Sequence, residues 1–264
     1  MNKPLITVIT VSYNAVSIIE KTILSVINQT YSNIEYIIID GGSTDGTIEI
    51  IKKYEDKITY WLSEPDKGIY DAMNKGIDKA TGEWINFMNC GDTFFCNTVI
   101  EDLFQKANTN SDVIYGNTNL LLLTGGYIQK GEIATDKEYM PFGHQASFSR
   151  TSLMKKYGFD RNYKICADRN FFYIAYKNNA VFEYVDVNVS NYEAEEGVSS
   201  VNMSRIFYEK GLIEGKTNDF SWKIKYFQFT LSQRVRQFIK QILPTKLVYK
   251  IKEYSAEHRL LKNN

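Results

Sequence analysis

The stretch that decides the fold of this 264-residue chain is IEYIIIDGGSTDGT, residues 34–47. An apolar, β-branched run at 34–39 ends in Asp40, and a glycine-rich turn then leads into the start of a helix. A second β-branched run occupies residues 5–11, and the apolar residues between the two runs recur every three or four positions from Ile18 to Ile27. This pattern predicts a β-α-β unit.

The alternation of strand and helix continues along the chain. We expect helices at 47–54 and 69–80 and strands at 58–62 and 83–88, the order of a parallel sheet with helices on both faces. The less regular remainder, 97–191, is expected to extend the same sheet, with strands near 113–115, 145–148 and 181–187 and helices near 151–157 and 168–177. The sequence therefore predicts an α/β protein with a mostly parallel central sheet flanked by helices.

The composition is that of an ordinary folded protein, 44% apolar and 23% charged with a formal net charge of zero. Three cysteines, odd in number and without C-x-x-C spacing, support neither a disulfide framework nor a thiolate metal site. The N-terminal residues show no signal-peptide pattern, and no run approaches the ~20 apolar residues of a membrane-spanning helix. We expect a cytoplasmic protein.

The C-terminal tail, residues 216–264, differs from the rest in charge, with eleven basic and three acidic residues. Apolar residues at three- and four-residue steps predict an amphipathic helix over 220–242, ending before Pro244, and a second stripe runs from Leu247 to Leu261. Such a tail could lie peripherally on an anionic membrane, dock against the rest of the chain, or form a homodimer. Nucleic acid is a weaker partner, because no recognised binding module surrounds the basic residues.

Polar loops follow three predicted strands, at 14–17, 40–46 and 89–93. In open α/β sheets, ligands bind beyond the carboxyl ends of the strands, so these loops are the candidate site. The loops at 40–46 and 89–93 also have a plainer explanation, a strand-to-helix turn in which a Ser, Thr or Asp side chain caps a helix. The acidic loop at 89–92 could instead hold a divalent cation through Asp92.

Taken together, five segments resemble family 2 glycosyltransferases: residues 10–14, 40–47, 64–76, 81–83 and 89–92. The resemblance is strongest over residues 4–95 and closest to the bacterial branch that builds capsules, lipopolysaccharide O-units and exopolysaccharide. It implies the nucleotide-diphospho-sugar transferase fold, named GT-A, and an enzyme that uses a nucleoside-diphosphate sugar, UDP-sugar above all, as donor.

The resemblance also implies a donor site. Nucleobase and ribose would be held by Val11, Tyr13 and Asp40, and the rest of the nucleotide-sugar pocket would be lined by Asp66, Lys67, Gly68, Asp71, Asn74 and Lys75. Asp92 falls beside the family's metal-binding D-x-D position, where Mn²⁺ or Mg²⁺ would bind. The usual second aspartate is absent, since Asn89, Cys90 and Gly91 stand there. Asp92 with diphosphate and water oxygens can still hold a divalent ion.

The weaker matches in the second half, 141–147 and 163–169, resemble acceptor-side segments and place His144, Gln145 and Arg169 at the acceptor. Asp168 occupies the family's position for the catalytic base, at the start of a predicted helix, where it could also be a helix cap.

The function implied is inverting transfer of a sugar to a saccharide or lipid-linked acceptor in surface-polysaccharide synthesis. Two alternatives are a sugar nucleotidyltransferase and a membrane-recruited scaffold without strong catalysis. We expect a catalytic domain at 1–215, with a nucleotide-sugar half at 1–95 and an acceptor half at 96–215, followed by the basic helical tail at 216–264. The cytoplasm, or the inner face of the cell membrane, is the expected location.

Overall fold

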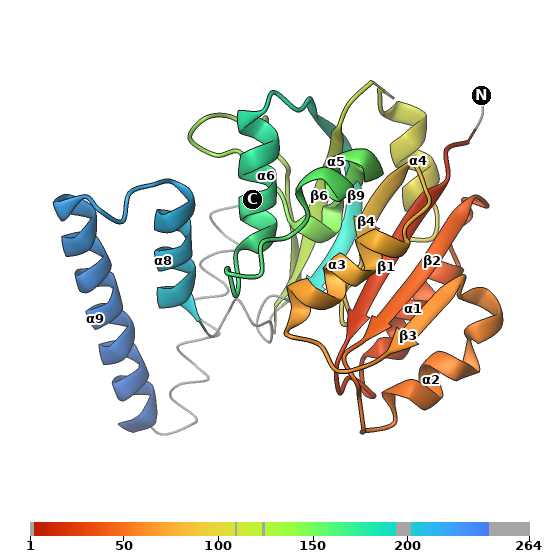
Figure 1. Cartoon of the computed structure of the whole chain (residues 1–264), viewed down its shortest axis with the longest axis horizontal. Helices are drawn as coiled ribbons and strands as arrows, with labels where there is room; N and C mark the ends of the chain where they lie inside the picture. Colours follow the sequence, from red (N-terminus) through yellow and green to blue (C-terminus); the bar gives the residue numbers. More distant parts are fainter. Residues whose placement is uncertain (1–2, 109, 123–124, 194–201, 243–264) are drawn as a thin grey trace. The chain divides into compact units, whose positions relative to one another are not determined.

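The computed structural model describes residues 3–108, 110–122, 125–193 and 202–242 (Figure 1). Its N-terminal half is built on four parallel strands in the order β3 (Tyr60–Ser63), β2 (Ile34–Asp40), β1 (Ile6–Ser12) and β4 (Trp84–Phe87). The connecting helices are α1 (Ile19–Ile27), α2 (Thr47–Lys53) and α3 (Ile69–Lys79). The β-α-β unit predicted from residues 5–47 is therefore confirmed.

Helices cover both faces of this parallel region. Alternate residues of a strand point to opposite faces, and Val8 of β1 belongs to the same buried cluster as Ile19 and Ile23 of α1. Ile9, the next residue, faces α3: a Cβ added at Gly76 would lie 2.6 Å from the Ile9 side chain. Glycine at position 76 thus lets α3 approach the sheet closely.

The second half of the chain continues the same sheet, largely antiparallel. Next to β4 come β8 (Ser147–Arg150), β6 (Val113–Leu122), β9 (Phe182–Glu193) and β5 (Thr93–Phe94), and β7 (Gly125–Gln129) pairs with β6. The helices here are α4 (Val99–Lys106), α5 (Thr151–Tyr157) and α6 (Ala167–Lys177). The predicted α/β fold, a central sheet flanked by helices, is confirmed, with the parallel strands concentrated in the N-terminal half.

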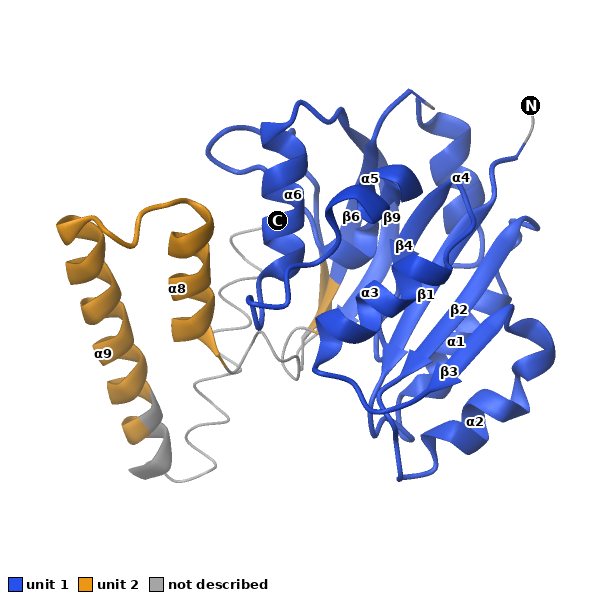
Figure 2. Cartoon of the chain, in the orientation of Figure 1, with its two compact units in different colours: residues 1–119, 128–192 blue, residues 120–127, 193–264 orange. Residues whose placement is uncertain are grey.

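Two compact units divide the chain (Figure 2): residues 1–119 with 128–192, and residues 120–127 with 193–264. The second unit contains α8 (Met203–Ile213) and α9 (Phe220–Ile242), which confirms the helix expected at 220–242. The stripe from Leu247 to Leu261 lies outside the described residues. The division at residue 215 stays a prediction. Among the described helices, none combines the length and hydropathy needed to cross a bilayer.

Candidate active site

Every candidate site residue lies in the first unit, and the site begins where β1 and β2 end side by side. Ser12 and Asp40 are partners in the parallel register. The Asp40 side chain is fully buried and accepts hydrogen bonds from the hydroxyls of Ser12, Ser43 and Ser63 and from the backbone N–H groups of Gly42 and Ser43, at 2.5–3.1 Å. Through these hydrogen bonds, the buried Asp40 side chain holds the glycine-rich turn in place.

The electrostatics of Asp40 follow from this cage. Burial alone would raise the pKa of its carboxyl, but the hydrogen bonds from Ser43, Ser63 and Ser12 outweigh burial and hold the pKa below its usual value. With both oxygens engaged by protein donors, Asp40 has no free face toward a ligand in this structure. These contacts shape the turn, and the contact of Asp40 with the nucleoside stays a prediction.

The loop after β1 is tied to the loop after β2 by side chains. Asn14, in the left-handed region at φ 46°, donates its backbone N–H to Ser43 Oγ at 2.8 Å, and its side-chain oxygen accepts from Thr44 N–H at 3.0 Å. Asp45 accepts from the N–H of Val16 and of Thr47, both at 3.0 Å. Asp45 thus bonds the first residue of α2, but Gly46 holds the N-cap position and no side chain caps this helix, so the capping explanation for Asp45 is not confirmed.

Tyr13 and Asp66 flank the glycine that follows Asp40. A Cβ added at Gly41 would lie 2.6 Å from Asp66 Oδ2 and 3.3 Å from the Tyr13 ring. The Tyr13 side chain is 66% exposed, whereas that of Val11 is buried within the sheet. An exposed ring and a carboxylate therefore face each other across a glycine that leaves room between them.

The block at 64–76 forms a network of its own. Asp66 accepts from the N–H of Gly68, at φ 112°, at 2.8 Å. Asp71 binds Arg161 at 2.6 Å and accepts from Lys67 N–H at 3.1 Å, which holds the pKa of its carboxyl below the usual value. Lys75 pairs with Glu64 at 2.7 Å, so one ion pair lies within the block and another joins it to Arg161.

Asn74 departs from the expectation that it lines the donor pocket. Its amide nitrogen donates to Phe159 O at 2.8 Å, and its amide oxygen accepts from Phe159 N–H at 2.9 Å. Both polar atoms of the side chain thus engage one backbone residue of the acceptor half. Asn74 joins α3 to the segment before α6.

Asp168 lies at the centre of the acceptor side. It is in the first turn of α6, which begins at Ala167 and has no side-chain cap, so the capping explanation for Asp168 is wrong. Asp168 Oδ1 accepts from the Tyr70 hydroxyl of α3 at 3.1 Å, and Oδ2 lies 3.6 Å from His144 Nδ1. The carboxylate side chain is 18% exposed. It therefore has two polar neighbours and keeps access to solvent.

His144 connects this carboxylate to the loop after β4. Its Nε2 lies 3.0 Å from Asn89 Nδ2, so the amide donates to Nε2 and the ring proton is assigned to Nδ1, facing Asp168. Burial lowers the pKa of His144, and the nearby Asp168 only partly opposes that. His144 is therefore neutral at pH 7. Gln145 and Arg169 have other partners. Gln145 is buried, and its backbone carbonyl accepts from the Asn86 side-chain amide. Arg169 binds Glu138 at 2.7 Å, and its guanidinium lies over the Tyr139 ring.

The loop after β4 offers oxygen atoms suited to a hard cation. Gly91, at φ 101°, allows a tight turn in which Asp92 N–H donates to Asn89 O at 2.9 Å. Asn89 Oδ1 is buried without a hydrogen-bond partner. Among the described residues, no three His, Cys, Asp or Glu side chains gather into a metal cluster. Side-chain oxygens of Asn89 and Asp92 fit a Mg²⁺ or Mn²⁺ ion whose other ligands would be diphosphate and water oxygens. They do not form a closed protein cage around an ion.

Sequence reasoning missed three residues of this site. Tyr70 and Asn89 stand inside segments already singled out, beside the acidic residues that drew attention, whereas Arg161 has no motif around it. Tyr70 is held by Ile165 O at 2.5 Å as well as by Asp168, and burial together with Asp168 raises the pKa of its hydroxyl. The available signal for Tyr70 was its position at the start of the helix predicted at 69–80, which borders the candidate pocket.

Comparison with known proteins shows the family to which this chain belongs. The family model described as glycosyl transferase family 2 matches residues 7–164. An uncharacterized glycosyltransferase of Mycobacterium tuberculosis is 35% identical over 179 residues, covering 64% of this chain and 67% of the relative. A PGL/p-HBAD biosynthesis glycosyltransferase of Mycobacterium bovis is 27% identical over 219 residues, covering 80% and 85%.

Two solved structures share the fold. Residues 1–349 of S. aureus TarS, in complex with UDP-GlcNAc, superimpose with a TM-score of 0.66 at 20% identity, over 80% of this chain and 66% of that one. A mannosyltransferase from Pyrobaculum calidifontis, in complex with GDP-Man and Mn²⁺, gives 0.63 at 14%, over 81% and 64%. This chain thus spans slightly less than two thirds of either structure. By its sequence match and its fold, the chain belongs to glycosyl transferase family 2 and is a glycosyltransferase of class EC 2.4.

Proposed function

We propose that this glycosyltransferase moves a sugar from a nucleoside-diphosphate sugar, most simply a UDP-sugar, to a saccharide or lipid-linked acceptor, inverting the anomeric centre. Bacterial surface polysaccharide is the proposed product class and the cytoplasmic side of the membrane the proposed location. Support for the donor comes from the TarS complex with UDP-GlcNAc. The resemblance described above supports the product class.

The observation that carries the proposal is the environment of Asp168. The carboxylate is partly exposed, is oriented by Tyr70 and His144, and is linked through His144 and Asn89 to the loop after β4. A base must lie close to the acceptor hydroxyl and to the reacting carbon at once. The link from Asp168 to the loop where the diphosphate is expected supports this role.

The proposed reaction is a single displacement. The acceptor oxygen forms a bond to the anomeric carbon while the bond from that carbon to the diphosphate oxygen breaks, and the hydroxyl proton passes to Asp168. General-base catalysis of this kind contributes roughly 10²–10⁴-fold to the rate. The nucleoside diphosphate leaves from the face opposite to the acceptor, which inverts the configuration.

Tyr70 and His144 are positioning residues in this scheme. The neutral imidazole directs its Nδ1 proton toward Asp168 Oδ2, and the one proton of the Tyr70 hydroxyl is shared between Ile165 O at 2.5 Å and Asp168 Oδ1 at 3.1 Å. Because the Tyr70 pKa is raised, the hydroxyl keeps its proton across the working pH range. Asp168 is thereby held in one orientation without losing its ability to accept a proton.

On the donor side, we propose that the exposed Tyr13 ring and Asp66 contact the nucleoside around Gly41. Lys67 and Gly68 would border the sugar diphosphate, whereas Asp40, Asp71, Asn74 and Lys75 maintain the shape of the pocket through the contacts described above. Asn89 and Asp92 would hold Mg²⁺ or Mn²⁺, which would neutralise charge on the departing diphosphate.

A donor-turnover screen tests the proposal. UDP-, GDP- and TDP-sugars are supplied with Mn²⁺, Mg²⁺ or EDTA, and release of nucleoside diphosphate is measured for the wild type and Asp92→Ala. Release from one donor, lost with EDTA and in Asp92→Ala, supports both the transferase and the metal role. Release that EDTA leaves unchanged removes the metal, and no release from any donor, even with bacterial lipid and saccharide acceptors added, contradicts the proposal.

A further inference from the structure

Helix α9 has two apolar faces, and within the described part of the second unit one of them packs against α8. Trp222, Tyr226 and Phe229, spaced four and three residues apart, pack against Phe207 of α8 with ring centroids 4.9–6.0 Å apart. A Cβ added at Gly211 of α8 would lie 2.2 Å from the Trp222 ring. Glycine there allows the close approach, so this aromatic face fixes α9 to α8.

The opposite face of α9 is apolar as well, and it is exposed. Its members repeat every three or four residues and so share one side of a helix with about 3.6 residues per turn. They are Phe220, Ile224, Phe227, Leu231, Val235 and Phe238, each between 43% and 79% exposed. A contiguous apolar stripe of this length is uncommon on the surface of a soluble protein unless something binds it.

The charges on α9 indicate what binds. Residues 220–242 contain five basic residues and no acidic one. Lys223 comes three residues after Phe220 and four before Phe227, and Arg234 comes three after Leu231 and four before Phe238. Residues at these spacings are surface neighbours on a helix. Cations thus border the apolar stripe.

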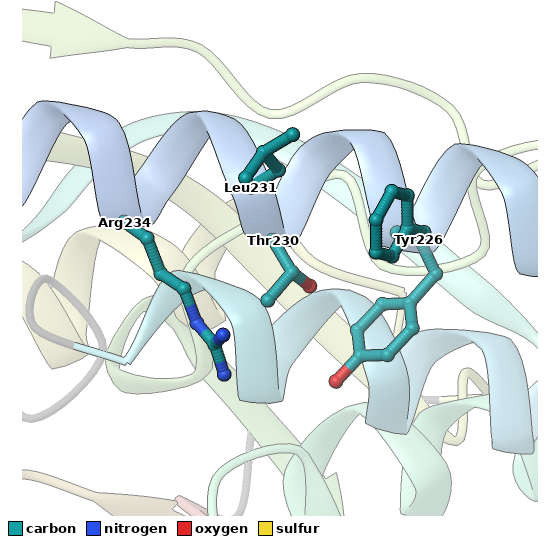
Figure 3. Close-up of a pocket in the computed structure, with 5 residues that line it drawn as sticks. Tyr226, Thr230, Leu231 and Arg234 are labelled. Carbon is teal, nitrogen blue, oxygen red and sulfur yellow. The ribbon is translucent and has the colours of Figure 1, made fainter.

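A shallow hollow on α9 also brings apolar side chains and a cation together (Figure 3). It is lined by Tyr226, Phe227, Thr230, Leu231 and Arg234. The Arg234 cation therefore stands beside the apolar side chains of Phe227 and Leu231. A phosphate headgroup next to acyl chains would satisfy both kinds of group.

We propose that α9 lies in the interface of an anionic lipid bilayer, with the stripe from Phe220 to Phe238 inserted and Lys223 and Arg234 at the headgroups. A second copy of the chain fits this face less well, because its own Lys223 and Arg234 would lie near those of the first copy and repel them. Apolar burial and attraction to anionic lipid act together in interfacial helices of this kind. The proposal does not depend on sugar transfer.

Vesicle flotation of the full chain tests it, with vesicles of phosphatidylglycerol and phosphatidylcholine compared with phosphatidylcholine alone. We expect binding to the anionic vesicles that falls as salt rises. The double variant Phe227→Asp with Leu231→Asp should weaken binding by more than about 100-fold, because it removes apolar contact and adds two negative charges. Lys223→Gln with Arg234→Gln should weaken binding by roughly 30-fold.

The matched control is Gln228→Asp with Ser232→Asp, which adds the same two charges, at the same spacing, at exposed positions one residue further along α9. This control should bind at least about ten times more tightly than the Phe227/Leu231 variant, and all variants should melt with the wild type, since the altered side chains are exposed. No binding to anionic vesicles, or equal loss in the control, overturns the proposal. A dimer in lipid-free solution that Phe227→Asp with Leu231→Asp dissociates would overturn it in favour of self-association.

Discussion

Asp40 and Asp168 are both acidic residues at the edge of the candidate site, but their surroundings are opposite. Asp40 is fully buried and accepts five hydrogen bonds from protein groups. Asp168 is partly exposed, with one hydroxyl and one neutral imidazole beside it. A carboxylate whose oxygens are all occupied holds backbone in place, whereas one with few donors remains able to take a proton.

The same contrast separates the donor half from the acceptor half. Around the donor loops, the polar side chains mostly satisfy one another: Asp71 binds Arg161, and Lys75 binds Glu64. Around Asp168, the groups instead form a line that reaches the loop after β4 through His144 and Asn89. The donor half is therefore expected to respond to substitution mainly in stability, and the acceptor half mainly in rate.

The largest effect is expected at Asp168. Asp168→Asn removes the proposed base and should lower donor turnover by about 10²–10⁴-fold. Nucleotide binding, measured by calorimetry, should stay within a few-fold of the wild type, because the donor loops are untouched. Turnover at the wild-type rate would show that another group accepts the proton.

Asp40→Asn should give the largest loss of stability. The amide leaves the serine and backbone donors without their charged acceptor inside a buried site, which we expect to cost about 2–4 kcal/mol of unfolding free energy. Urea denaturation measures it. Asp45→Asn is the control, because Asp45 is an exposed carboxylate of the same turn that accepts from Thr47 N–H, and it should lose clearly less stability than Asp40→Asn.

The pH dependence of stability sharpens this prediction. The pKa of Asp40 is lower in the folded protein than in the unfolded chain, so its contribution is fully present above the unfolded value of about 3.9. That contribution disappears as pH falls through the folded pKa. The wild type should therefore approach Asp40→Asn in stability below about pH 4, and a constant gap down to pH 2 would contradict the assignment.

Asn74→Ala tests a residue that the sequence assigned to the donor pocket. Loss of its paired hydrogen bonds to Phe159 should cost about 1–2 kcal/mol in urea denaturation. The KM for the donor should change by less than about threefold. A large rise in KM with unchanged stability would return Asn74 to the pocket.

His144→Gln should have the smallest effect, roughly a tenfold loss of kcat, which is what loss of a positioning contact costs. Because the His144 pKa is lowered in the folded protein, the unfolded chain takes up a proton below about pH 6.5 that the folded chain does not. The wild type should thus lose stability relative to His144→Gln as pH falls from 6.5. A parallel pair of stability curves would contradict the lowered pKa, because it would show that the folded and unfolded chains take up this proton at the same pH.

Much of the fold could be predicted because it depends on local periodicity. The β-branched runs that became β1 and β2 were recognisable, and α5 (Thr151–Tyr157) has the predicted range. The short strand β5 (Thr93–Phe94) was not predicted, since two residues carry no period and the strand exists through its pairing with β9.

The site could be predicted less completely, for a related reason. A sequence shows that Asp71, Asn74 and Lys75 share a helix face, but it does not show what lies opposite. The partners of Asp71 and Asn74 are Arg161 and Phe159, 90 and 85 residues further along the chain. The roles of the residues singled out stay predictions, and only the tertiary contacts show which of them already bind other protein groups.

The most direct test of the account measures Asp168→Asn and Asp40→Asn side by side, each for donor turnover per folded molecule and for unfolding free energy. The account predicts that Asp168→Asn loses at least about 100-fold in turnover with stability within about 1 kcal/mol of the wild type. Asp40→Asn should lose stability and keep turnover within about tenfold when folded. Wild-type turnover in Asp168→Asn, or a greater loss of turnover in Asp40→Asn, would contradict it.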